Sequence, residues 1–85
     1  FVLSQNYPNP FNPQATIEYI LPQRDHVKLT VFDLQGRVVE VLLDDMKNPG
    51  VHHVTFNGSS LSSGIYYYRM ETSQGSVTRK MMLLK

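Results

Sequence analysis

The side chains that could bind a metal ion or act in catalysis are few and scattered along this sequence. His52 and His53 are adjacent, and successive side chains of a strand leave opposite faces, so the two cannot chelate one ion together. His26 is far from both, and no cysteine is present to supply a thiolate ligand or nucleophile. We therefore expect structural or solvated histidines, no metal site and no cofactor.

The acidic and hydroxyl residues do not form a recognisable catalytic pattern. Asp44 and Asp45 resemble half of a calcium-binding loop, but the further oxygens at alternate positions are missing, which favours a solvated acidic loop. Four serines gather within residues 59–63, yet no strand–nucleophile–helix elbow frames them. No two carboxylates are placed where a cleft is expected. The sequence predicts a domain that is not an enzyme.

Three consecutive aromatic residues, Tyr66, Tyr67 and Tyr68, allow two interpretations. On a strand, Tyr66 and Tyr68 share one face and Tyr67 takes the other. An exposed strip of rings could stack on sugars, as in a carbohydrate-binding module. The interpretation that we favour buries Tyr66 and Tyr68 in the core, with their hydroxyls on a loop carbonyl or water, because sugar platforms need several rings in register.

Length and charge exclude several classes of protein. Eighty-five residues allow one small domain. The 8 basic and 7 acidic residues give a net charge of +1, which offers no basis for binding nucleic acid. No apolar stretch is long enough for direct membrane insertion, and the first residues do not form a signal peptide. The chain begins on Phe1 rather than Met, so we expect a piece of a longer protein.

Apolar and polar residues alternate with period two in most of the chain, which is typical of half-buried strands. A tight reversal is expected at residues 33–37, where the Asp33 carboxylate can accept from turn amides and Gly36 can adopt positive φ. Residues 44–50 are expected to form a long loop, and residues 38–43 to be buried on both faces or bulged. The expected strands are residues 16–21, 26–33, 38–43, 51–56, 65–72 and 77–84.

Residues 1–15 contain three closely spaced prolines and read as an extended lead-in that packs on the domain. We expect its rings, Tyr7 and Phe11, to be buried and to fix it in place. Residues 16–85 are expected to form an all-β, small Ig-like (Greek-key) antiparallel β-sandwich of about seven strands. The other expected structural residues are Leu29, Val31, Val54, Phe56, Leu61 and Tyr68.

Four stretches, in this order, resemble one family. They are residues 5–13 (QNYPNPFNP), 29–37 (LTVFDLQGR), 63–69 (SGIYYYR) and 79–85 (RKMMLLK). Together they are similar to the type A C-terminal sorting domain of the type IX secretion system, found on exported proteins of Bacteroidetes. Asn57 stands where the family often has Asp. The resemblance implies that recognition is carried by Asp33, Gly36, Arg37, Gly64, Tyr66, Lys80 and Lys85.

The resemblance also implies a function and partners. A domain of this kind directs an upstream cargo domain through the periplasm and across the outer membrane to the cell surface or exterior. The implied partners are the outer-membrane translocon, its shuttle protein, and a sortase-like surface peptidase that removes the domain and attaches the cargo. The alternatives are a carbohydrate-binding module or a structural Ig-like accessory module of a secreted enzyme.

Residues 79–84 allow two interpretations of their own. Arg79 and Lys80 precede an apolar run, which places a basic spot beside a strand that could pair with a receptor strand by β-augmentation. Alternatively, residues 81–84 complete the core, and Lys80 and Lys85 are solvated.

Overall fold

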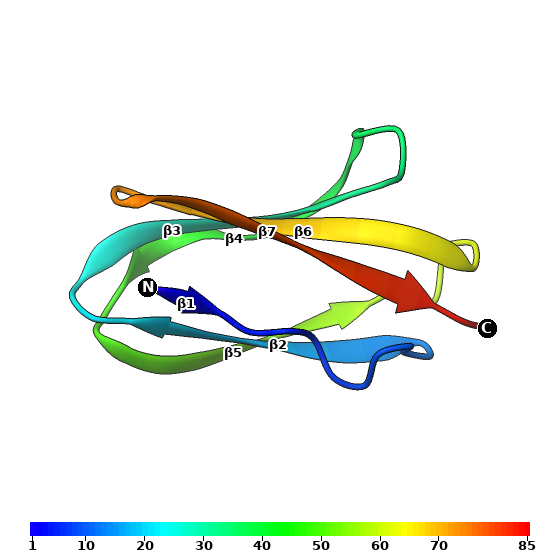
Figure 1. Ribbon diagram of the computed structural model, residues 1–85, viewed down its shortest axis with the longest axis horizontal. Coiled ribbons are helices and arrows are strands. Elements are labelled where there is room, and N and C mark those ends of the chain that lie inside the picture. The colour runs from blue at the N-terminus through cyan, green and yellow to red at the C-terminus, as the bar shows by residue number, and fades with distance from the viewer.

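The computed structural model describes all 85 residues and contains seven strands and no helix. The strands lie in two layers that face each other across the core (Figure 1). One sheet has the order β1-β2-β5 and the other the order β4-β3-β6-β7, and all strand pairs are antiparallel. The strands are β1 (Val2–Leu3), β2 (Gln14–Leu21), β3 (Asp25–Phe32), β4 (Val38–Lys47), β5 (Gly50–Asn57), β6 (Gly64–Thr72) and β7 (Gly75–Leu83).

The core is formed by the inward-facing residues of strands in which apolar and outward-facing residues alternate. In β2 every second side chain, from Ala15 to Leu21, points inward, and β3 and β6 do the same from the opposite sheet. Phe11 and Phe56 meet edge to face, with ring centroids 6.0 Å apart. Fifteen buried hydrophobic residues form one cluster: Leu3, Phe11, Ala15, Ile17, Tyr19, Leu21, Val27, Leu29, Val31, Phe56, Tyr66, Tyr68, Met70, Met81 and Leu83.

The connections between the two sheets make the predicted Greek-key sandwich. The β3–β4 and β6–β7 hairpins both lie in the four-stranded sheet, while β5 returns to the other sheet and pairs with β2. The next connection crosses back and places β6 beside β3. No helix of the structure is long and apolar enough to cross a membrane.

The proline-rich lead-in passes from one sheet to the other. Its first residues pair with β2, and an isolated bridge follows between Tyr7 and Thr16. It then reaches the four-stranded sheet, where Phe11 bridges Leu83 of β7. The expectation that Tyr7 is buried is wrong: it is 55% exposed, whereas Phe11 is 1% exposed. The lead-in is fixed by the Phe11 ring and by backbone bonds, so its other ring is free to face solvent.

The expectation of a long loop at residues 44–50 is also wrong. β4 continues through both aspartates to Lys47, and only Asn48 and Pro49 separate it from β5. β4 is one of the two outer strands of its sheet, so its outward side chains are solvated and carboxylates are tolerated there. Of the two alternatives for residues 38–43, the bulge is confirmed, because the pairing with β3 shifts register twice.

Most of the other expected structural residues are buried. Leu29, Val31, Phe56 and Tyr68 are each 0% exposed. Val54 and Leu61 are only partly buried, and both pack against the core cluster. Leu61 does so from the loop between β5 and β6, which closes one end of the sandwich.

Candidate functional site

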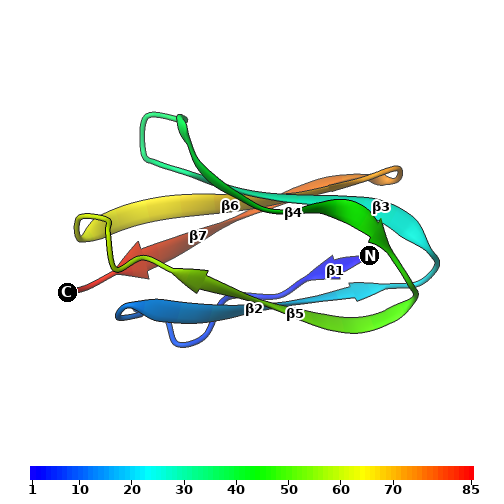
Figure 2. The same ribbon diagram turned by 180° about the vertical axis from the view of Figure 1, so that it is seen from behind.

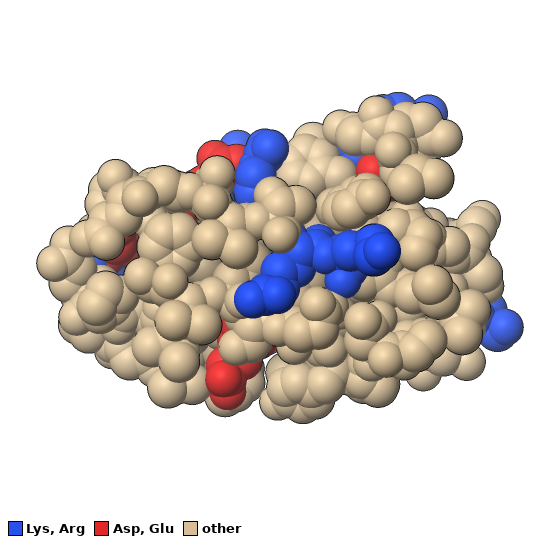
Figure 3. All heavy atoms as spheres, viewed as in Figure 1, with Lys and Arg blue, Asp and Glu red and all other residues tan.

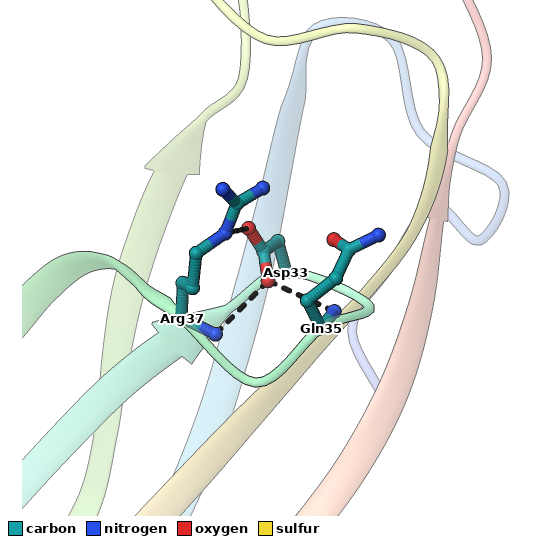
Figure 4. Close-up of polar contacts among 3 residues, drawn as sticks. All are labelled: Asp33, Gln35 and Arg37. Carbon is teal, nitrogen blue, oxygen red and sulfur yellow. Dashed lines mark hydrogen bonds and ion pairs between the residues drawn. The ribbon is translucent and has the colours of Figure 1, made fainter.

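The β3–β4 turn is held by one carboxylate (Figure 4). Asp33 Oδ1 accepts hydrogen bonds from the backbone N–H groups of Gln35 (3.0 Å) and Arg37 (2.9 Å). Asp33 Oδ2 accepts from Arg37 Nε at 2.8 Å. Gly36 adopts φ 86°, which L side chains rarely reach, and its N–H donates to the Asp33 carbonyl. The predicted roles of Asp33 and Gly36 in the turn are confirmed.

This geometry fixes which groups of the turn reach solvent. The Asp33 side chain is 19% exposed, whereas that of Arg37 is 76% exposed. Arg37 Nε is bonded to Asp33, so the two terminal guanidinium nitrogens remain available to another molecule. Leu34, at the tip of the turn, is 61% exposed. The turn therefore presents a cation and an apolar side chain in fixed positions.

Two carboxyl groups have pKa values below their ordinary range. The backbone N–H of Arg37, followed by its guanidinium, lowers the pKa of Asp33. At the other end of the sandwich, the hydroxyl of Ser73 and the backbone N–H of His26 lower the pKa of Asp25. In both cases the folded state holds the ionised form through hydrogen bonds, and the unfolded chain does not.

We expect the melting temperature to fall as the pH is lowered from about 5 to about 2. The unfolded carboxyls titrate near 3.9, above the folded values, so the unfolded chain binds more protons in this range and stability decreases with falling pH. Circular dichroism melts across this range measure the effect. The Asp33→Asn variant should melt lower at pH 7 and show a shallower acid decline; a parent profile that is flat down to pH 2 would contradict the assignment.

Most of the residues implied by the family resemblance line one open groove beside this turn. The groove has a volume of about 280 Å³ and is bounded by the turn on one side and by the start of β6 on the other. Gly64 begins β6 with φ 151°, and Tyr66 donates its hydroxyl proton to the Ser62 carbonyl at 2.8 Å. The lining residues are Asp33, Leu34, Gln35, Arg37, Ser63, Gly64, Ile65 and Tyr66.

A second hollow of about 150 Å³ lies on the other side of Ile65, which lines both. Lys80 belongs to this hollow and sits opposite Tyr67 in the β6–β7 pairing. The lead-in forms the far wall through Asn9 and Pro10. The lining residues are Asn9, Pro10, Ile65, Lys80, Met81 and Met82.

Lys85 lies next to the first groove. Its backbone N–H donates to Ser63 Oγ at 3.0 Å, and its Nζ donates to the Ser59 carbonyl at 2.6 Å. The structure therefore groups the recognition candidates around the β3–β4 turn and the adjoining parts of β6 and β7, whose near ends lie on the right in Figure 1. We refer to the residues lining the two hollows, together with Lys85, as the turn-end surface.

The turn-end surface carries more positive than negative charge. Arg37, Lys80 and Lys85 have exposed side chains, while the single carboxylate, Asp33, is occupied by the turn. In the space-filling view, basic side chains gather in the middle of the face over β7 (Figure 3). This arrangement suits contact with a polar or acidic surface.

The lead-in closes the edge of β7 at this end. Met82 donates its N–H to Asn9 Oδ1, and its carbonyl accepts from the Phe11 N–H at 2.9 Å. Phe11 in turn accepts from the Leu84 N–H at 3.0 Å. Met81 and Leu83 are each 0% exposed. Met81 and Leu83 therefore complete the core, whereas Met82 and Leu84 are 37% and 50% exposed, so the expectation of a buried run holds for two of the four residues. A receptor strand could pair with this end of β7 only after displacing the lead-in.

Sequence reasoning did not identify several residues of the lead-in that hydrogen-bond β6 and β7. Asn9 and Gln5 bond the β7 backbone from the lead-in, and Asn6 is 2% exposed and donates its N–H to Tyr68 Oη. The only signal in the sequence was the presence of amide side chains before and between the prolines, since such side chains bond backbone groups readily. Their partners lie more than sixty residues away in sequence, so spacing alone could not identify them.

The histidines lie apart from this surface. His52 stacks on Tyr19 with ring centroids 5.0 Å apart, His53 lies 3.1 Å from Glu18 Oε1, and His26 lies 2.8 Å from Asp44 Oδ1. Nowhere do three His, Asp or Glu side chains gather to form a potential metal site. Of the three tyrosines, Tyr66 and Tyr68 are buried as expected, and Tyr67 is half-buried on the outer face.

Comparison of the sequence with known protein families gives one match. The family model described as "Secretion system C-terminal sorting domain" matches residues 5–84. The match includes the lead-in from Gln5, the β3–β4 turn and β7. No curated protein matches the chain.

Proposed function

The chain belongs to the family of secretion-system C-terminal sorting domains, and we propose that the secretion machinery recognises the domain by binding its turn-end surface. The domain is a sorting signal for type IX secretion, by which a cargo protein crosses the outer membrane. The cargo reaches the cell surface or the extracellular space by way of the periplasm. Membership also implies an upstream cargo and the type IX machinery as partners.

The observation that carries the proposal is the convergence of the two hollows on Ile65. Residues from the β3–β4 turn, the start of β6, the end of β7 and the lead-in meet there, although they are distant in sequence. Such a surface exists only in the folded domain and is independent of the attached cargo. A signal shared by unrelated cargo proteins requires both properties.

The roles of individual partners follow from this proposal. The translocon and its shuttle protein bind the turn-end surface, and a sortase-like peptidase then removes the domain from its cargo. Domains of this family are in general non-catalytic, and we extend this to the present chain. We also propose that the lead-in, residues 1–15, acts with residues 16–85 as one folding unit, because its bonds to β2 and β7 bridge both sheets.

The function is tested by fusing residues 1–85 to a fluorescent reporter in a host that has type IX secretion. The reporter should appear at the cell surface and should stay in the periplasm when the translocon is deleted. Equal surface signal with and without the translocon would refute the assignment.

Reversing one charge on the turn-end surface should impair export without unfolding the domain. Lys80 is exposed and its amino group makes no hydrogen bond or ion pair, so Lys80→Glu should change stability by no more than about 0.5 kcal/mol. We expect export to fall about tenfold, equivalent to about 1.4 kcal/mol of lost binding free energy. Surface fluorescence of the reporter fusion and a thermal melt of the purified domain measure the two effects.

The matched control is Arg24→Glu, which makes the same charge change in the β2–β3 turn at the opposite end of the sandwich. This variant should export like the parent. If both variants were equally impaired, net charge rather than this surface would determine recognition.

A further inference from the structure

The four outer strands of the two sheets differ in how their edges are protected. β1 is only two residues long. β4 has two register shifts and carries Glu40, Asp44, Asp45 and Lys47. β7 carries Arg79 and Lys80, and its end is closed by the lead-in. Short length, bulges, charges and coverage are the means by which natural sheets prevent edge-to-edge pairing.

β5 has none of these protections. It runs for eight residues in unbroken register with β2 and contains no Lys, Arg, Asp, Glu or Pro. Three of its residues, Val51, Val54 and Thr55, are β-branched and favour strand conformation. No strand lies on its outer side (Figure 2). β5 is thus a regular, uncharged and open strand edge.

The backbone bonds of neighbouring residues show which groups of β5 are free. Gly58 donates its N–H to the Pro13 carbonyl, and Thr16 is bonded to Tyr7 of the lead-in rather than to β5. Hydrogen-bonded pairs alternate along an antiparallel ladder, so the even-numbered residues of β5 face β2. The N–H and C=O groups of Val51, His53 and Thr55 therefore point away from the sheet, and all three side chains are exposed.

We propose that β5 pairs with β5 of a second copy, joining two three-stranded sheets into one of six strands. Antiparallel pairing about a two-fold axis places the same outward-facing residues of both copies beside each other. Because β5 contains no Lys, Arg, Asp or Glu, this self-pairing brings none of these charged side chains of the two copies together. Self-pairing of β4 would bring its carboxylates together, and self-pairing of β7 its two cations.

The proposed dimer leaves room for an attached cargo. Phe1 lies beside β1, and β2 separates β1 from β5 in the sheet. A cargo domain joined at Phe1 would leave from the edge opposite the proposed interface. The turn-end surface is formed by other elements and stays accessible in both copies.

Sedimentation velocity of the 85-residue domain tests the proposal. An interface of one strand pair is small, so we expect reversible dimers to appear between about 0.02 and 2 mM. Thr55→Lys places a charge on the free edge and should lower the association constant at least tenfold. The control Val41→Lys adds the same charge to β4, at a residue 46% exposed, and should leave association unchanged.

Thr55→Pro gives a second, independent check. It removes the outward N–H of Thr55 and no bond to β2, so the fold is retained while the dimer is lost. A domain that is monomeric at about 2 mM, or dimers abolished by Val41→Lys and not by Thr55→Lys, would overturn the proposal. The association is measured without the secretion machinery, so its failure would not affect the proposed sorting function.

Discussion

Replacing Phe11 with Ala is expected to destabilise the domain by about 3–5 kcal/mol. The ring is 1% exposed, packs edge to face on Phe56, and its backbone joins the lead-in to β7. A domain of this length has a total stability of only about 4–13 kcal/mol. The variant should therefore lose a large part of its stability, which urea unfolding followed by circular dichroism would measure.

Tyr7→Ala is the matched control, because it removes the other aromatic ring of the lead-in. Tyr7 is 55% exposed, and its bonds to Thr16 involve only the backbone. We expect a change within about 0.5 kcal/mol. A loss below 1 kcal/mol for Phe11→Ala, or similar losses for both variants, would mean that the Phe11 ring does not anchor the lead-in.

Replacing Tyr68 with Phe is expected to cost roughly 2–6 kcal/mol, although it removes a single oxygen. The buried hydroxyl donates to the Ser4 carbonyl at 2.7 Å and accepts from the Asn6 N–H at 2.8 Å. Both backbone groups would lose their partner, at about 1–3 kcal/mol each. Urea unfolding again gives the measurement.

Tyr67→Phe removes the same oxygen from the neighbouring residue, on the outer face of the sheet, where the hydroxyl makes no hydrogen bond within the domain. Its stability should match that of the parent within about 0.5 kcal/mol. Equal effects of the two substitutions would show that the Tyr68 hydroxyl does not hold the lead-in.

The sequence predicts the central strands of this fold well, for a physical reason. β2, β3 and β6 have one face in the core and the other turned outward, so their side chains alternate in the printed order of residues. The β3–β4 turn was predictable because Asp33 and Gly36 act within five residues of each other. Interactions between residues that are close in sequence can be predicted from the sequence itself.

β4 was predicted less well because it is an edge strand. Its outward positions carry Asp44 and Asp45, and the bulges break the alternation that defines a strand in sequence. Charged residues followed by Pro49 and Gly50 then look like a loop. Only the pairing partner, β3, shows that the strand continues to Lys47.

The lead-in and the turn-end surface depend on contacts between distant residues. Composition cannot reveal that Phe11 is buried and Tyr7 is not, because the choice depends on where β7 and Tyr68 lie. Likewise, the family resemblance named Arg37 and Lys80, but their placement on either side of Ile65 follows from the strand order.

The bonds between the lead-in and β7 also have a consequence for the timing of biosynthesis. Gln5 bonds Lys80, and Phe11 bonds Met82 and Leu84, so the beginning of the domain is secured only by its last strand. Contacts this far apart in sequence form late in folding. A ribosome must release nearly the whole domain before its native shape can arise, and a prematurely terminated chain would lack it.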